Sequence, residues 1–416
     1  MIHYFNPGHE IAVLNASKHY HPPAHIAKMQ ADLAFLPAWY ASAGDFVYME
    51  TQLPNDFMLS CQPLDLQVKP VTPADFSGNR EMFRQLTVDL WGISPQSVYF
   101  FEKLNEQWKL SLAIPAWKEE FRFLGSRFAS QKFLALLLER ISGIEPEIFP
   151  QFVSNIETIE QLTVQSQEQL LVKSPYSSSG RGLIWLPPAK LAQSEKQLLT
   201  GMLKKQKQVS IEKALDKQLD FSMQFEITDE GKTQFLGYSI FQTNDKGAYE
   251  KSLLDTQERL EERITSYIDK ELLIQTQRTL TGIIHEMIAP CYAGIIGVDM
   301  LIYKSGGSFH LHPCVEINMR KNMGYLAVRF SEKRLHPGSH GEFIIKYNRN
   351  PQATILKHNQ LQKQYPLVVD SGRVRSGYFS FCPVTDSTNY HAYMIIENYS
   401  IAVSFTVSTK RKKIIS

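Results

Sequence analysis

The chain has 416 residues, of which 43% are hydrophobic and 21% are charged, and its formal net charge is +2. This length predicts two or three domains with a large buried core, and the balanced charge gives no indication of a nucleic-acid partner. The four cysteines lie far apart without a CxxC pair, so neither a disulfide framework nor a zinc knuckle is indicated. No apolar run approaches the roughly eighteen residues that span a membrane, and the first residues lack a signal-peptide pattern, so we expect a cytoplasmic protein without a membrane partner.

Residues 1–115 are expected to form an α/β domain with a parallel sheet, because helix and strand signals alternate through about residue 110. The strand-like start is followed by the turn residues NPG, and in such a domain this loop lies at the sheet edge where ligands usually bind. Asn6, His9 and Glu10 are therefore candidate substrate contacts. The alternative is that His9 and Glu10 only cap the next helix.

A domain boundary is expected near Pro115, which interrupts the pattern. The run SRFASQKFLALLLERISG then predicts an amphipathic helix with Ser130 as its N-cap and Gly143 as its terminator. Lys132 lies in the first turn of this predicted helix.

Residues 170–186, LLVKSPYSSSGRGLIWL, predict two strands joined by a loop of small and hydroxylated residues. Small residues let a backbone approach a ligand closely, and glycine tolerates the positive φ that turns successive amide groups toward phosphate oxygens. Lys173, at the end of the first strand, would add a positive charge. A polar surface hairpin without a ligand is the alternative. The candidate loop residues are Ser177, Ser178, Ser179, Gly180, Arg181 and Gly182.

Residues 294–320 predict a second pair of strands, joined by the turn residues SGG. Glu316 and Asn318 are two residues apart and therefore share one face of their strand. Asp299, on the partner strand, interrupts an apolar run, and a buried carboxylate needs a partner or a metal ion. Carboxylate and amide oxygens are ligands of the kind that hold Mg²⁺. The alternative is a hairpin with polar residues on its solvent face.

From residue 331 to residue 416 the composition shifts to short β-rich runs separated by turn signals. We expect a small β-rich C-terminal appendage outside the candidate site, which could shape a substrate pocket or form a homo-oligomer contact.

The order of these features resembles the ATP-grasp superfamily: a strand lysine, a Ser/Gly-rich hairpin loop, an aspartate strand and a closing ExN followed by an arginine. D-Alanine ligases, glutathione synthetases and biotin carboxylases belong to it, and FNPGHEIAVLNAS and HPCVEINMRKNMG resemble a bacterial branch. The resemblance covers roughly residues 120–330. It implies an α/β (α+β) chain with an N-terminal pre-ATP-grasp domain (1–115), an ATP-grasp domain with two sheets that sandwich ATP (116–330) and the appendage (331–416).

The resemblance also implies roles for individual residues. Lys132 would reach the α-phosphate of ATP, and Lys173 with the loop would hold the other phosphates. Glu212 and Asp220, in a segment similar to the adenine-holding hinge, would accept bonds from the ribose. Asp299, Glu316 and Asn318 would hold Mg²⁺, and Arg320 would stabilise the transferred phosphoryl group or the acyl-phosphate oxyanion.

The implied function is that of an ATP- and Mg²⁺-dependent ligase, which activates a small-molecule or peptide carboxylate as an acyl phosphate and passes it to an amine or a thiol. Three alternatives remain open at this stage. The chain could be an ATP-grasp kinase or phosphotransferase, a nucleotide-binding module without catalysis, or a protein whose loop is an unrelated hairpin.

Overall fold

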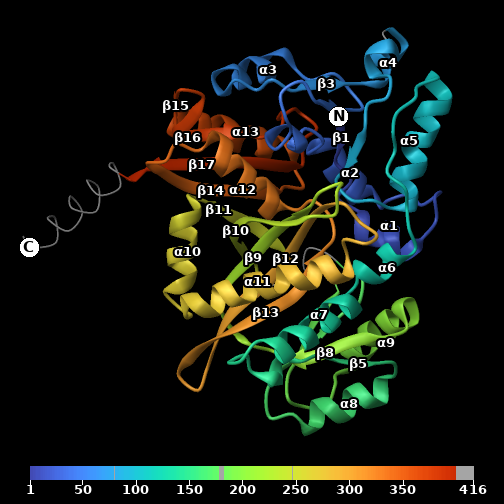
Figure 1. The fold of residues 1–416 in the computed structure, drawn as a ribbon, viewed down its shortest axis with the longest axis vertical. Coiled ribbons are helices and arrows are strands. Elements are labelled where there is room, and N and C mark those ends of the chain that lie inside the picture. The colour runs from blue at the N-terminus through green and yellow to red at the C-terminus, as the bar shows by residue number, and fades with distance from the viewer. Residues whose placement is uncertain (79, 178–181, 246, 400–416) are drawn as a thin grey trace, which may run out of the picture.

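The computed structural model describes residues 1–78, 80–177, 182–245 and 247–399, and it has a mixed α/β architecture built on three sheets (Figure 1). A parallel sheet lies near the N-terminus and two antiparallel sheets follow it. The α/β fold class and the parallel N-terminal sheet are as the sequence predicts.

The N-terminal sheet has the strand order β3-β2-β1-β4, with every pair parallel. Helix α5 shows how local sequence sets an element boundary, because Ser94 and Ser97 form a capping box and Pro95 occupies the first turn. The elements of this region are β1 (Ile2–Tyr4), α1 (His9–Asn15), α2 (Ala24–Asp32), η1 (Leu36–Trp39), β2 (Phe46–Tyr48), α3 (Asn55–Cys61), η2 (Gln62–Leu64), β3 (Lys69–Val71), α4 (Pro73–Gly78), η3 (Arg80–Phe83), β4 (Val88–Leu90) and α5 (Pro95–Trp108).

A small four-stranded antiparallel sheet follows, with the order β5-β8-β6-β7. Its strands β6 and β7 are the pair predicted around the Ser/Gly-rich loop. Helices α8 and α9 pack on this sheet through their buried apolar residues. The elements are α6 (Glu120–Leu124), α7 (Arg127–Arg140), η4 (Pro146–Ile148), β5 (Gln151–Val153), α8 (Ile156–Gln165), β6 (Leu170–Lys173), β7 (Leu183–Leu186), α9 (Gln193–Gln206) and β8 (Val209–Lys213).

The large sheet is antiparallel and has nine strands in the order β13-β12-β9-β10-β11-β14-β17-β16-β15. Its β12–β13 hairpin has the predicted tight turn, where Gly306 and Gly307 both have positive φ, as a two-residue turn between twisted strands requires. The elements are β9 (Asp216–Ile227), β10 (Thr233–Thr243), β11 (Tyr249–Leu254), α10 (Gln257–Thr265), α11 (Lys270–Met287), β12 (Gly294–Ser305), β13 (Ser308–Asn318), α12 (Met323–Arg334), β14 (Ser339–Tyr347), α13 (Pro351–Gln364), β15 (Val368–Asp370), β16 (Arg373–Ser380) and β17 (Tyr390–Asn398).

From Phe221 to Phe225, strand β9 is buried on both of its faces, although its alternating apolar and polar residues are typical of a strand with one buried face. Phe221, Met223 and Phe225 pack in the core that α11 covers. Ser222 and Gln224 point the other way and are also buried. Asn322, at the start of α12, donates a hydrogen bond to Gln224, so α12 covers this polar face at Gln224, whereas Ser222 borders the cavity described below.

The residues after 331 are β-rich as predicted, and β14 to β17 extend the same sheet that carries β9 to β13. Helix α13 lies between them and was not predicted. A core of aromatic and aliphatic residues joins these strands to the N-terminal region, where the Trp39 indole N–H donates to the carbonyl oxygen of Phe381 at 2.8 Å. The last of the β-rich runs, IAVSFTV at residues 401–407, lies outside the described residues. Across the described ranges, the helices are all too short or too polar to cross a membrane.

Candidate active site

A cavity of about 500 Å³ lies between the small sheet and the large sheet. Strands β6, β7 and β8 form one wall, and β9, β12 and β13 form the other. The third side is closed by the N-terminal region through Pro7 and Trp91. The carboxyl ends of β1 and β4 point here, as expected for a ligand site at a parallel sheet edge.

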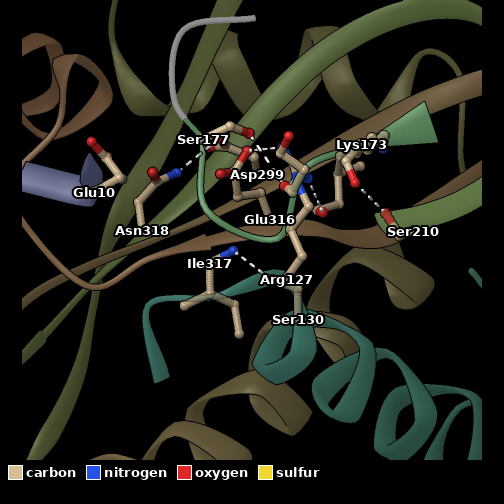
Figure 2. A network of polar contacts seen from close by, with 12 residues as sticks. Glu10, Arg127, Ser130, Lys173, Ser177, Ser210, Asp299, Glu316, Ile317 and Asn318 are labelled. Atoms are coloured by element: carbon tan, nitrogen blue, oxygen red, sulfur yellow. Dashed lines mark hydrogen bonds and ion pairs between the residues drawn. The ribbon is translucent and has the colours of Figure 1, made fainter. Parts of the chain in front are cut away.

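Asp299, Glu316 and Asn318 lie together at the large-sheet wall (Figure 2). Asp299 on β12 is paired directly with Glu316 on β13, which brings their side chains to the same face. The amide of Asn318 donates a hydrogen bond to the Asp299 carboxylate at 2.9 Å. The predicted convergence of these three residues is therefore present in the fold.

The electrostatics of this group suit a cation. Burial and the neighbouring Glu316 carboxylate raise the pKa of Asp299 from its ordinary 3.8 to about 7. A divalent ion would relieve the repulsion between the two carboxylates, and the oxygen-only donor set fits Mg²⁺. Among the described residues no group of three or more His, Cys, Asp or Glu side chains is arranged as a metal site, so a metal ion bound here would have two carboxylates and one amide as its protein ligands.

We expect Asp299→Asn to stabilise the metal-free protein at pH 8 much more than at pH 5. The raised pKa means that the folded state holds the Asp299 proton more tightly than the unfolded state, so this stability is present below about pH 4 and is lost as the pH rises through about 7. Asparagine cannot ionise, so the variant does not lose this part of the free energy of unfolding, which is roughly 1–4 kcal/mol. Urea unfolding in EDTA between pH 5 and pH 8 measures the difference, with the exposed Asp229→Asn as control. If the unfolding free energies of the variant and the wild type differed by the same amount at every pH, the expectation would be contradicted.

Two buried cations, Lys173 and Arg127, lie close to these carboxylates. Lys173, at the end of β6, forms an ion pair with Glu212 on β8, and burial lowers its pKa. Arg127, in the first turn of α7, donates to Glu316 at 2.8 Å and to the carbonyl oxygens of Ser174 at 3.2 Å and Val315 at 3.3 Å (Figure 2). Arg127 therefore connects the small sheet to the large one across the floor of the cavity.

Lys132 does not reach the cavity. It is exposed on α7 and does not line the pocket, so the structure does not place it where the resemblance implies. The helix begins at Arg127 after Ser126, and Ser130, the predicted N-cap, lies inside it. The Ser130 hydroxyl instead accepts a hydrogen bond from the backbone N–H of Ile317 at 3.1 Å, which fixes α7 against β13 next to Glu316.

The loop between β6 and β7 is described only at its two ends. Ser177 is buried beside the site, and its hydroxyl donates to the Ser174 carbonyl at 3.4 Å. Gly182 has φ +80°, and a Cβ there would lie 2.7 Å from the Ser174 hydroxyl, so both conformation and space require glycine. The other loop candidates, Ser178, Ser179, Gly180 and Arg181, lie outside the described residues.

Glu212 and Asp220 both line the cavity, at the end farther from the N-terminal region. Glu212 is held by its ion pair with Lys173. Asp220 forms an ion pair with Lys217 at 2.5 Å and accepts a hydrogen bond from Thr243 at 3.3 Å, and burial raises its pKa. Both carboxylates are therefore placed to accept hydrogen bonds from a ligand in this part of the cavity.

Arg320 follows β13 directly and lines the cavity beside Asn318. Its guanidinium donates to the Asn318 side-chain oxygen at 2.9 Å and forms an ion pair with Glu10 on α1. Glu10 thus reaches the site through Arg320. The planar guanidinium is therefore held between Glu10 of α1 and Asn318 of β13, which fixes its orientation.

Asn6 and His9 do not line the cavity and have structural contacts instead. The Asn6 amide donates to the carbonyl of Gly92 at 2.8 Å and accepts from the N–H of the same residue at 3.1 Å. The His9 ring packs so close to Gly92 that a Cβ there would lie 2.5 Å away. Pro7, between them, is the residue of this turn that contacts the cavity.

The sequence does not single out Arg127, because it precedes Ser130, the predicted N-cap of this helix. The only available signal was a basic residue directly after Gly125 and Ser126, which together end one helix and begin the next. A boundary placed four residues earlier would have put Arg127, instead of Lys132, in the first turn.

No protein-family model matches the chain, and no curated protein matches it. Similar solved structures include N5-carboxyaminoimidazole synthetase from Staphylococcus aureus complexed with ADP, at 12% identity and TM-score 0.49, covering 89% of this chain and 98% of that one. Another is a biotin carboxylase–ATP complex from Campylobacter jejuni, at 10% identity and TM-score 0.49, covering 98% and 90%. Similarities this distant carry no argument about the function of this chain, which has to be inferred from its own geometry.

Proposed function

We propose that this protein is an ATP- and Mg²⁺-dependent ligase that activates a carboxylate as an acyl phosphate and transfers the acyl group to an amine. One observation carries the proposal: a single cavity is lined both by two buried cations, Arg127 and Lys173, and by the paired carboxylates Asp299 and Glu316. Phosphates need the first set, and the metal ion that accompanies them needs the second.

The ion pairs of the ligand-free protein support this proposal. Arg127 is paired with Glu316 on the large sheet, and Lys173 is paired with Glu212 on its own sheet, so each buried cation is neutralised by a carboxylate. If a metal ion alone bound Glu316, Arg127 would lose its ion-pair partner. If phosphates alone bound Arg127, Glu316 would lose its partner. An unpaired charge in a buried site is costly in either case. ATP and Mg²⁺ together replace both partners at once, so we expect their binding to be strongly coupled.

In this scheme each residue has a defined task. Arg127 and Lys173 orient the phosphates, while Glu212 and Asp220 accept hydrogen bonds from the ribose. Asp299, Glu316 and Asn318 would hold Mg²⁺, which offsets the charge that develops as the γ-phosphoryl group moves. Arg320 stabilises the substrate carboxylate and later the oxyanion of the acyl phosphate.

The reaction needs no side-chain nucleophile. A carboxylate oxygen of the substrate forms a bond to the γ-phosphorus, the bond to the bridging oxygen breaks, and ADP leaves. The amine nitrogen then attacks the acyl carbon, loses a proton to solvent or a basic group, and inorganic phosphate leaves with the former carboxylate oxygen. The amide product therefore forms without redox chemistry.

Hydroxylamine tests the proposal without knowledge of the natural amine. Hydroxylamine is a small, strong nucleophile that takes the place of the amine and converts an acyl phosphate to a hydroxamate. The hydroxamate gives a coloured iron complex. We expect a panel of carboxylates to include one that gives hydroxamate and ADP in equal amounts, only with ATP and Mg²⁺. ADP release with a phosphorylated hydroxyl product and no hydroxamate would instead establish a kinase. If MgATP does not raise the midpoint of thermal unfolding, the protein has no nucleotide site.

A further inference from the structure

Beyond Arg320 the cavity continues toward the N-terminal region and changes character. Its wall here contains Pro7 from the β1–α1 turn, Met29 from α2, Trp91 after β4 and Met323 from α12. These side chains come from separate parts of the chain, and all of them are apolar. This apolar part of the cavity wall is therefore formed by the fold as a whole and not by one loop.

Ser222 and Asn322 line the cavity on this side, and both are paired with the buried Gln224 behind them. The Gln224 amide donates to the Ser222 hydroxyl at 2.8 Å, and the Asn322 amide donates to the Gln224 oxygen at 3.0 Å. On the neighbouring strand β11, Tyr249 and Ser252 share a hydrogen bond of 2.9 Å. Because these groups have protein partners, they form a neutral wall that offers no unpaired charge to a ligand.

Close packing fixes this arrangement. A Cβ at Gly324 would lie 2.6 Å from the Gln224 amide nitrogen, and one at Gly297 would lie 2.3 Å from the Asn322 amide nitrogen. The neutral wall is therefore held by two glycines that let the side-chain amides approach the backbone.

The two ends of the cavity differ in charge. Arg127, Lys173, Lys213 and Lys217 line the end assigned to the nucleotide. Among the described residues that line the other end, charge is found on Arg320, which Glu10 partly neutralises. A second ionised group on a ligand would lose its hydration here without gaining a partner.

We propose that the carboxylate substrate is a monocarboxylic acid with an uncharged, apolar body, of which an aromatic acid is the simplest example. This rests on the function proposed above: Arg320 binds the single carboxylate at the boundary, and the body extends between Trp91 and the two methionines. Thioether and indole side chains adapt to aromatic rings and make favourable contacts with them. A dicarboxylate or a phosphorylated acid does not fit this chemistry.

The test compares two probes of similar length, 3-phenylpropionate and glutarate, by calorimetry on the full chain saturated with Mg²⁺ and a non-hydrolysable ATP analogue. We expect 3-phenylpropionate to bind at least roughly tenfold more tightly, since glutarate must bury its second carboxylate. Equal binding, tighter binding of glutarate, or no binding of 3-phenylpropionate would overturn the proposal. The preceding titration with Mg²⁺ and the analogue separates the two ideas, because failure at that step removes the proposed function itself.

A gain of binding gives a second, independent readout. Met29→Lys places an ammonium group in the apolar wall, so it should tighten glutarate roughly tenfold and weaken 3-phenylpropionate. Met82→Lys is the matched control, because Met82 is 44% exposed and does not line the cavity. Unchanged preference in a folded Met29→Lys protein would overturn the assignment of this wall. If Met29→Lys does not fold, Met323→Lys replaces it on the same wall.

Discussion

Replacing Glu316 with glutamine is expected to lower MgATP-dependent turnover by roughly a thousandfold or more while the fold is retained. Glutamine has nearly the same shape and still accepts a hydrogen bond from Arg127, which now contacts Glu316 at 2.8 Å. What the variant loses is the charge that the proposed metal site shares with Asp299. Turnover is measured by hydroxamate formation, and fold by the thermal midpoint without ligand.

Glu286→Gln is the matched control for this experiment. Glu286 also pairs with an arginine, Arg140, at 3.0 Å, but on the surface and away from the cavity. An exposed ion pair contributes little, so this variant should keep full activity. A Glu316→Gln protein that turns over at the wild-type rate would remove the metal role from Glu316 and the ligase mechanism with it.

The parts of the site that the sequence predicts well are the ones set by local rules. The β12–β13 hairpin follows from two apolar runs around Gly306 and Gly307, and strand alternation then places Glu316 and Asn318 on one face. The pairing of Asp299 with Glu316 could be inferred only in outline. Its register depends on an irregularity between Asp299 and Leu301, next to Pro313, which has no N–H to donate to the ladder.

Contacts between distant segments could not be predicted in the same way. The turn after β1 was correctly expected near the site, but only the fold shows that Asn6 binds Gly92 and that Glu10 reaches the site through Arg320. Likewise, nothing in the β-rich pattern after residue 331 indicates that its strands continue the large sheet. Such pairings are decided by which apolar faces remain to be covered, and the chain order does not contain that information.

Arg127 is the clearest case of such a contact, and it yields the second large prediction. Arg127→Ala should lower turnover roughly 10²–10³-fold and remove most of the midpoint rise that MgATP produces, because the phosphates lose a buried donor group and the two sheets lose their connection. Arg127→Lys keeps the charge but cannot contact Glu316, Ser174 and Val315 together, so it should recover only part of the activity.

Lys132→Ala decides between the function proposed here and the family resemblance, because the two assign the phosphate contact to different residues of α7. Lys132 is exposed, and its loss should change stability by no more than about 0.5 kcal/mol and leave MgATP binding intact. The reverse result, in which Lys132→Ala loses nucleotide binding and Arg127→Ala keeps it, would show that α7 rotates or shifts when the nucleotide binds. In that case the ion pair between Arg127 and Glu316 would belong to the ligand-free state alone, and Lys132 would be the phosphate contact that the resemblance implies.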